Sequence, residues 1–206
     1  MSDKRIKHMV YFAGFIEASP GQSGTWRDIS YKELQHQDLL IYCPVRQEAI
    51  KTGKNAIDNC EQIKHYKQGG AFDKFFDIMW NIWAGVIEYK PGMDLISLFV
   101  AMRMRKYLDG NRERDLAFMG DWESVIRSDF VLAYLPKNIL TVGTHWELFL
   151  CVLFRIPVYL VLPDTSRTDA NSTMIFGNML ACQGKVNIFY SLPEALTAVK
   201  KDYNLN

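Results

Sequence analysis

Five short apolar runs constrain the fold of this chain more strongly than any other feature of its sequence. Runs of about four to eight apolar residues are typical of strands that are buried on both faces of a parallel sheet. Four of the runs end at a glycine or proline, which stops a strand, and the fifth leads into a helical segment. The runs are Met9–Ala13, Leu39–Cys43, Phe130–Leu135, Val158–Leu162 and Val186–Tyr190. The sequence therefore predicts a five-stranded parallel sheet.

Segments with a helical pattern lie between these runs. They are Thr25–Gln35, Trp122–Arg127, Thr144–Phe154 and a last helix from Pro193 to Lys200. Strands that alternate with helices favour an α/β sandwich of three layers, Rossmann-like or flavodoxin-like. Right-handed crossovers bring the carboxyl ends of parallel strands to one edge of the sheet, where ligands bind. We therefore expect the chemistry just after the apolar runs.

The segment from about residue 55 to residue 119 has a helical and aromatic pattern and contains no predicted strand. Its aromatic part includes Phe75, Trp80 and Trp83, and Leu95–Tyr107 has a basic face at Arg103, Arg105 and Lys106. Two roles fit this pattern: a helical hairpin whose aromatic side chains pack on the sheet, or a lid over the functional site. We predict a single domain over residues 1–206 with this segment as a helical insertion.

Composition excludes several classes of partner. The chain has 24 Lys+Arg and 23 Asp+Glu, so it lacks the basic excess of a protein that binds a nucleic-acid polymer. Leu148–Leu162, the most apolar stretch, contains Arg155 and Pro157 and is too short to span a membrane. The four cysteines form no CxxC pair, and residues 1–8 lack an apolar signal region. We expect a cytoplasmic protein with no bound metal and no membrane contact.

Glu147 is the first candidate for chemistry. After the third predicted strand, a loop containing Gly143 leads into a helix that has Glu147 near its start. The N–H groups at a helix N-terminus bind phosphate or hydroxyl oxygens, and the helix dipole favours an ionised carboxylate there. Such a carboxylate can attack an anomeric carbon and form a covalent glycosyl-enzyme. A glutamate in this place is also commonly a solvated capping group, so the motif alone leaves both roles open.

The segment Gly120–Asp164 resembles the nucleoside 2-deoxyribosyltransferase family in the order and spacing of its short motifs. The corresponding residues are Asp121, Ser128-Asp129, Gly143-Thr144, Glu147-Leu148 and Ile156-Pro157-Val158. The opening Val10–Gly14, which reads VYFAG, is similar to the first strand and turn of the family. The matched motifs together cover about a quarter of the chain. The family includes related nucleoside 5′-monophosphate N-glycosidases.

The resemblance implies a role for each matched residue. Glu147 would be the nucleophile at the sugar C1′, in a retaining double displacement that needs no cofactor. Asp121 would contact the sugar or base and help to orient Glu147, and the Tyr11 hydroxyl would hold the carboxylate. Gly14 would let the ligand approach closely. Two alternatives stay open: Tyr11 as an aromatic residue of a core strand, and Asp121 as a helix N-cap.

Position 141 departs from the transferase pattern. Six residues before the nucleophile, the transferases commonly have an aspartate that exchanges a proton with the leaving base, and here the residue is Thr141. A threonine cannot act as a general acid near neutral pH. The related N-glycosidases have a small hydroxyl residue there that helps to bind the 5′-phosphate. Thr141 would suit that role with the amides of the helix start, so Gly143 and Thr144 complete a predicted substrate-binding set.

The segment Asn171–Gly177 loosely resembles a family segment that reaches the site of a neighbouring subunit, which adds Asn171 and Met174 to the predicted substrate-binding residues. The resemblance thus implies a homo-oligomer with shared active sites. Three functions stay open. The first is transfer of a sugar between a nucleoside and a free nucleobase, and the second is hydrolysis of a nucleoside 5′-monophosphate. The third is a nucleotide-binding sensor without turnover.

Overall fold

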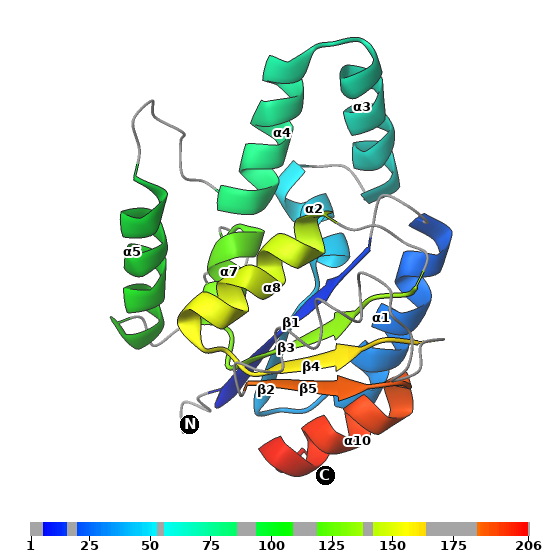
Figure 1. The fold of residues 1–206 in the computed structure, drawn as a ribbon, viewed down its shortest axis with the longest axis vertical. Helices are drawn as coiled ribbons and strands as arrows, with labels where there is room; N and C mark the ends of the chain where they lie inside the picture. The colour runs from blue at the N-terminus through cyan, green and yellow to red at the C-terminus, as the bar shows by residue number, and fades with distance from the viewer. Residues whose placement is uncertain are drawn as a thin grey trace. The chain divides into compact units, whose positions relative to one another are not determined.

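The computed structural model describes residues 6–15, 20–52, 56–85, 94–108, 119–137, 142–163 and 185–205. Figure 1 shows the ribbon of the chain, which divides into two compact units that are described one at a time below. The first unit comprises Met1–Ile41 and Ser128–Asn206, and the second comprises Tyr42–Arg127.

A single five-stranded parallel sheet confirms the strand prediction. Its order is β2 (Leu39–Tyr42), β1 (His8–Gly14), β3 (Phe130–Tyr134), β4 (Val158–Val161) and β5 (Val186–Phe189). The register pairs Tyr11 with Val131, Leu132 with Tyr159, and Leu160 with Ile188. The three central strands are almost entirely buried, which explains why they read as continuous apolar runs rather than alternating ones.

Helices cover both faces of this sheet. Helix α8 (Val142–Phe154) packs on β1, while α10 (Leu192–Tyr203) packs on β4, β5 and α1 (Pro20–Leu34). Figure 1 shows α8 crossing one face of the sheet and α1 and α10 on the other face. This arrangement follows from right-handed crossovers that leave the centre of the sheet in opposite directions. The predicted three-layer, Rossmann-like α/β sandwich is therefore confirmed.

Two helices begin two or more residues earlier than the sequence predicted, and α7 (Asp121–Arg127) and α10 begin one residue earlier. Helix α1 begins at Pro20 instead of Thr25, and α8 begins at Val142 instead of Thr144. Gly21 and Gly24 lower the helix propensity before Thr25 and so placed the predicted start too late. Proline at the first helical position compensates, because its missing N–H has no intrahelical partner there and its φ already suits a helix.

Polar contacts fix the amino edge of the sheet and the position of α10. The Met9 N–H donates to Asp129 Oδ2 at 2.8 Å, and the Asp129 N–H donates back to the Met9 carbonyl at 2.8 Å. The Tyr159 hydroxyl of β4 donates to Asp202 on α10 at 2.6 Å. The first two contacts join the start of β1 to the start of β3, and the third joins α10 to β4.

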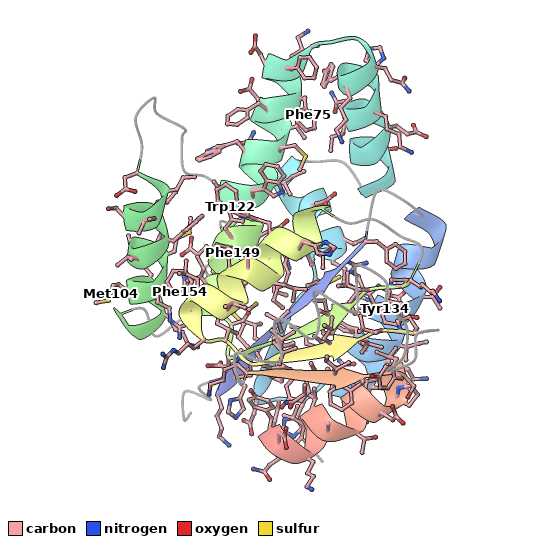
Figure 2. All side chains as sticks on the ribbon, in the orientation of Figure 1. Phe75, Met104, Trp122, Tyr134, Phe149 and Phe154 are labelled. Atoms are coloured by element: carbon pink, nitrogen blue, oxygen red, sulfur yellow. The ribbon has the colours of Figure 1, made fainter. Side chains whose placement is uncertain are left out.

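Among its described residues, the second unit is helical apart from Tyr42, the last residue of β2, and an isolated bridge between Gly85 and Met119. Its helices are α2 (Pro44–Thr52), α3 (Ala56–Gln68), α4 (Phe72–Ala84), α5 (Leu95–Leu108) and α7 (Asp121–Arg127). Of the aromatic residues singled out in the sequence, Trp80 and Trp83 lie against Trp122, whereas Phe75 packs on the cluster of Ile63, Met79 and Ile82; Phe75 and Trp122 are labelled in Figure 2. The rings of Trp80, Trp83 and Phe99 have centroids 5.5, 5.7 and 5.4 Å from that of Trp122.

The basic residues predicted on Leu95–Tyr107 make contacts with α7. Arg105 pairs with the buried carboxylate of Glu123 at 3.3 Å, and Arg103 donates to the Ile126 carbonyl at 2.5 Å. Glu123 also pairs with Arg127 at 3.2 Å, one turn further along α7. Two residues of the basic face, Arg103 and Arg105, therefore take part in packing inside the second unit.

Candidate functional site

The strand order creates a topological switch point between β1 and β3. The chain moves from β1 to β2 on one side and from β3 to β4 on the other. In open α/β sheets, ligands bind outside the carboxyl ends of the strands at such a point. Gly14 and Tyr134 end the two strands and are partners in register. The side chains that β1, β3 and α8 bring to this part of the first unit are therefore the candidates for a functional site.

Tyr11 and Glu147 meet between β1 and α8. Tyr11 is fully buried in the middle of β1, and Glu147 is half-buried in the second turn of α8. The Tyr11 hydroxyl donates a hydrogen bond to Glu147 Oε1 with a length of 2.5 Å. Short O–H···O contacts of this kind are typical of an ionised acceptor, and a donated hydrogen bond favours the charged carboxylate. The contact predicted for these two residues from the family resemblance is present.

The face of α8 that contains Glu147 also has Thr144 and Cys151, three residues before and four residues after it. Both side chains are buried. Burial raises the pKa of the Cys151 thiol well above its ordinary value, and the negative charge of Glu147 raises it further. Cys151 therefore stays a neutral thiol at physiological pH, which excludes it as a thiolate nucleophile. Glu147 is the group on this face that can attack a carbon.

The start of α8 is open beside Gly143. Apart from its chain neighbours and its own helix backbone, no heavy atom of the described residues would lie within 4 Å of a Cβ built on Gly143, and the residue is exposed. The first N–H groups of a helix have no intrahelical acceptor and can bind an oxyanion or hydroxyl. The predicted contribution of Gly143 and Thr144 to substrate binding is compatible with this geometry and stays a prediction.

Gly14 is needed for packing in the first unit. A Cβ at this position would lie 2.7 Å from Cζ2 of Trp26 and 3.1 Å from the Tyr134 carbonyl oxygen. The space that a side chain would enter is therefore occupied by an indole ring of α1. The predicted close approach of a ligand to Gly14 stays a prediction.

Sequence reasoning missed three residues that surround the end of β1. Trp26 stacks on Tyr134, with ring centroids 5.3 Å apart and planes 12° apart. The buried Arg27 side chain donates to the carbonyls of Gly14 and Phe15, each at 3.0 Å. It also lies 4.6 Å from the centroid of the Trp26 ring, a cation–π distance. The adjacent Trp-Arg pair inside a predicted helix was the only signal, and it does not reveal where either side chain lies.

Asp121 belongs to the second unit. It is the first residue of α7 and is buried, with the Tyr42 hydroxyl donating to its Oδ1 at 3.2 Å. The same hydroxyl lies 3.2 Å from the Met119 carbonyl oxygen. Burial, and secondarily the charge of Asp121, raises the pKa of Tyr42 well above its ordinary value. A carboxylate at this place is stabilised by the helix dipole. The predicted role of Asp121 at the sugar stays a prediction.

Three predicted substrate-binding residues, Thr141, Asn171 and Met174, lie outside the described residues. Within the described part of the chain, His, Cys, Asp and Glu side chains form no group of three or more that could hold a metal ion. None of the helices described has both the length and the apolar character needed to cross a bilayer.

Comparison with known proteins adds no relative: no protein-family model matches the chain, and no curated protein matches its sequence.

Proposed function

We propose that this chain cleaves or exchanges the N-glycosidic bond of a (deoxy)nucleoside or nucleotide through a covalent intermediate on Glu147. The observation that supports the proposal is the hydrogen bond from Tyr11 to Glu147 in a sheet with the 2-1-3-4-5 order. This bond orients a carboxylate between β1 and α8. Folds of this type bind ligands at the topological switch point of the sheet. The family resemblance supplies the class of substrate.

The chemistry requires one nucleophilic oxygen and one leaving base. A carboxylate oxygen of Glu147 attacks C1′ while the bond from C1′ to the base nitrogen breaks, and that nitrogen keeps the electron pair and takes a proton from solvent water. In the second step a new base or a water molecule attacks C1′ and releases a proton to solvent, and the bond to Glu147 breaks. Two inversions give net retention at C1′. Because Tyr11 engages Oε1, its hydroxyl would fix the carboxylate plane through both steps.

The acceptor decides between the two enzymatic alternatives. A free nucleobase in the second step makes the protein a deoxyribosyltransferase, and water makes it an N-glycoside hydrolase. Thr141 favours the hydrolase on the resemblance, since a threonine cannot return a proton to a base and could instead contact a 5′-phosphate. The open start of α8 beside Gly143 would offer N–H donors to the same phosphate.

Base release is the direct test. Wild type, Glu147→Ala and Glu147→Gln are incubated with a panel of nucleosides and 5′-monophosphates, with and without a second free base, and products are separated by chromatography. Glu33→Gln is the matched control, because Glu33 is a carboxylate of the same unit in an exposed pair with Lys200. We expect release in wild type and in the control, and loss of release in both Glu147 variants.

The reaction products distinguish transfer from hydrolysis. A new nucleoside in the presence of a second base means transfer, and free sugar or sugar phosphate alone means hydrolysis. A 2-fluoro-substituted nucleoside, which slows the second step, should leave a sugar adduct on the peptide that contains Glu147. Nucleotide binding without base release in wild type would overturn the proposal in favour of a sensor. Base release that persists in Glu147→Ala would remove Glu147 from the mechanism.

A homo-oligomer in the cytoplasm is part of the same proposal. The outer side of α8 supports it, because Trp146, Phe149 and Leu153 are 41%, 51% and 51% exposed. Their spacing places them on one stripe of the helix, and Trp146 stacks on Phe149 with ring centroids 5.6 Å apart. An uncharged stripe can pair with its own copy across a two-fold axis without charge repulsion. Light scattering on wild type and Phe149→Glu tests this, with a monomeric wild type as the contradicting result.

A further inference from the structure

One buried polar group of the first unit lacks a hydrogen-bond partner. Trp26 on α1 is 4% exposed and its indole N–H is buried, yet no atom of the described residues accepts a hydrogen bond from Nε1. A buried indole N–H usually finds an acceptor, so an unsatisfied one requires an explanation. A ligand that supplies the missing acceptor is such an explanation, and the surroundings of Trp26 favour it.

This donor lies at the carboxyl edge of the sheet, next to the switch point. A Cβ built on Gly14, the last residue of β1, would lie 2.7 Å from Cζ2 and 3.3 Å from Cε2 of Trp26. Nε1 is covalently bonded to Cε2, so the donor is next to the edge of the indole that contacts the end of β1. Tyr134, the last residue of β3 and labelled in Figure 2, stacks on the same indole with ring centroids 5.3 Å apart. Ligands of open α/β sheets bind outside these strand ends.

The adjacent Arg27 makes this indole a stronger donor. The guanidinium carbon lies 4.6 Å from the centroid of the Trp26 ring, and the Arg27 side chain is 2% exposed. A positive charge over the ring withdraws electron density and makes the N–H hydrogen more positive, and water screens this effect little in a buried place. An acceptor with partial negative charge therefore gains more from this N–H than from an ordinary indole.

The surroundings favour a planar, uncharged ligand over a phosphate. The ring of the buried Phe12 has its centroid 5.8 Å from that of Trp26. The ring of the buried Phe15 lies 6.4 Å from that of Tyr134. Arg27 already donates to two backbone carbonyls at the end of β1. A phosphate needs several donors, whereas a planar base stacks on aromatic rings and needs one donor for a carbonyl oxygen.

We infer that the Trp26 indole N–H binds a carbonyl oxygen of the nucleobase and stabilises the base as it leaves. The inference rests on the proposed function, because it names the group that recognises the leaving base. When the bond from C1′ to the base nitrogen breaks, the electron pair passes to that nitrogen and is shared with the carbonyl oxygen. The hydrogen bond from Trp26 strengthens as this oxygen gains negative charge. The base then takes its proton from solvent water, so no acid is needed at position 141.

Binding of free bases tests the inference without turnover. Hypoxanthine and uracil have carbonyl oxygens, whereas adenine has none. Each base is titrated into wild type that contains ¹⁵N-labelled tryptophan, and the indole N–H signal of Trp26, assigned through its covalent neighbours, is followed. Hypoxanthine, uracil or both should move this signal saturably downfield and leave the signal of Trp83, in the second unit, unchanged. Adenine should bind at least about tenfold more weakly than the better oxo base, and inorganic phosphate should not move the Trp26 signal.

Replacement of the indole by a phenyl ring removes the donor and keeps an aromatic side chain. Trp26→Phe should weaken binding of the better oxo base about tenfold and change binding of adenine little. Release of that base from its nucleoside should slow about tenfold or more. The loss should be smaller with 5-fluorouracil than with uracil as the leaving base, because the fluorinated base carries negative charge more readily. Trp83→Phe makes the same replacement in the second unit and should change neither binding nor release.

The outcomes separate the inference from the proposed function. Base release by wild type together with a Trp26 signal that no base moves would overturn the inference and leave the proposed function standing. A Trp26 signal that moves equally with adenine, or with inorganic phosphate, would also overturn it. Movement with an oxo base in a protein that releases no base would support recognition by Trp26 and count against the proposed function. These titrations use wild type alone, so they decide even where Trp26→Phe does not fold.

Discussion

The Tyr11 hydroxyl donates a 2.5 Å hydrogen bond to Glu147 Oε1, although the two residues are 136 positions apart in the chain. Tyr11 comes from a strand that is buried on both faces, and Glu147 comes from the helix that packs on that strand. A buried phenol can hold a carboxylate in one orientation because its ring is fixed by the core around it. The bond therefore connects the packing of the sheet to the group that we propose as nucleophile.

Replacing Tyr11 with phenylalanine tests what this bond contributes. A hydrogen bond to a charged group is worth about 1.5–3 kcal/mol, so Tyr11→Phe should slow base release by roughly 10- to 100-fold. The ring itself remains in the core, so the fold should persist. Tyr190→Phe, a half-buried tyrosine that follows β5, is the control. The measurement is the steady-state rate of base release with the best substrate. An unchanged rate in Tyr11→Phe would mean that Tyr11 serves only as an aromatic residue of the core.

Alanine substitutions at two glycines of the first unit should change the free energy of unfolding in opposite directions. In Gly14→Ala the new Cβ would lie 2.7 Å from Trp26 Cζ2, and overpacking of this kind costs about 1–3 kcal/mol. In Gly143→Ala the new Cβ would meet no described residue outside its own helix and chain neighbours within 4 Å, and alanine favours a helix by about 0.4–1 kcal/mol. Urea unfolding at constant temperature measures both free energies. Equal effects of the two substitutions would contradict the tight packing of Trp26 on Gly14.

Two carboxylates in ion pairs should differ strongly in their effect on stability. Glu123 is buried and pairs with Arg127 and Arg105, so Glu123→Gln removes the carboxylate from a buried ion pair at a cost of about 3–5 kcal/mol. Glu33 pairs with Lys200 on the surface, and Glu33→Gln should change little. Thermal unfolding of both variants at low and high salt is the measurement. A small effect at Glu123 would mean that its pairs contribute no more than surface pairs do.

The buried Tyr42 should make stability depend on alkaline pH. Burial, with a further contribution from Asp121, raises its pKa in the folded protein above the value of about 10 in the unfolded chain. Its contribution to stability is therefore complete below pH of about 10 and is lost as the pH rises towards the folded pKa. Tyr42→Phe should lower stability at neutral pH by about 1–3 kcal/mol through the lost hydrogen bond to Asp121.

The same variant should also lose less stability than wild type between neutral and strongly alkaline pH, because the titrating group is gone. Urea midpoints of wild type and Tyr42→Phe at about pH 7.5 and pH 10.5 provide the comparison. Parallel declines in the two proteins would show that Tyr42 does not contribute to the alkaline loss.

Much of the fold of the first unit was accessible from local patterns. The runs at residues 9–13, 130–135 and 158–162 predicted strands correctly, because a strand buried on both faces must be apolar at nearly every position. The boundaries of α1 were less accessible, since a proline start and two glycines gave opposing signals. In the second unit the aromatic pattern predicted helices, but it did not reveal that Trp122 would be their common contact.

The candidate site was partly accessible in the same way. Glu147 stood out because it follows a glycine-containing loop at a helix start, and the resemblance added Tyr11. Trp26 and Arg27 gave no usable signal. Their partners are distant in the chain or belong to the backbone, and neither kind of contact leaves a periodic pattern.

The sequence by itself determined which segments are strands and helices and which elements are buried, because hydrophobic periodicity and turn residues act over a few neighbouring positions. Only the tertiary structure decided the strand order 2-1-3-4-5 and the meeting of Tyr11 with Glu147. These depend on which elements pack together across more than a hundred residues. That choice is set by the packing of the whole core, which no local stretch of sequence contains.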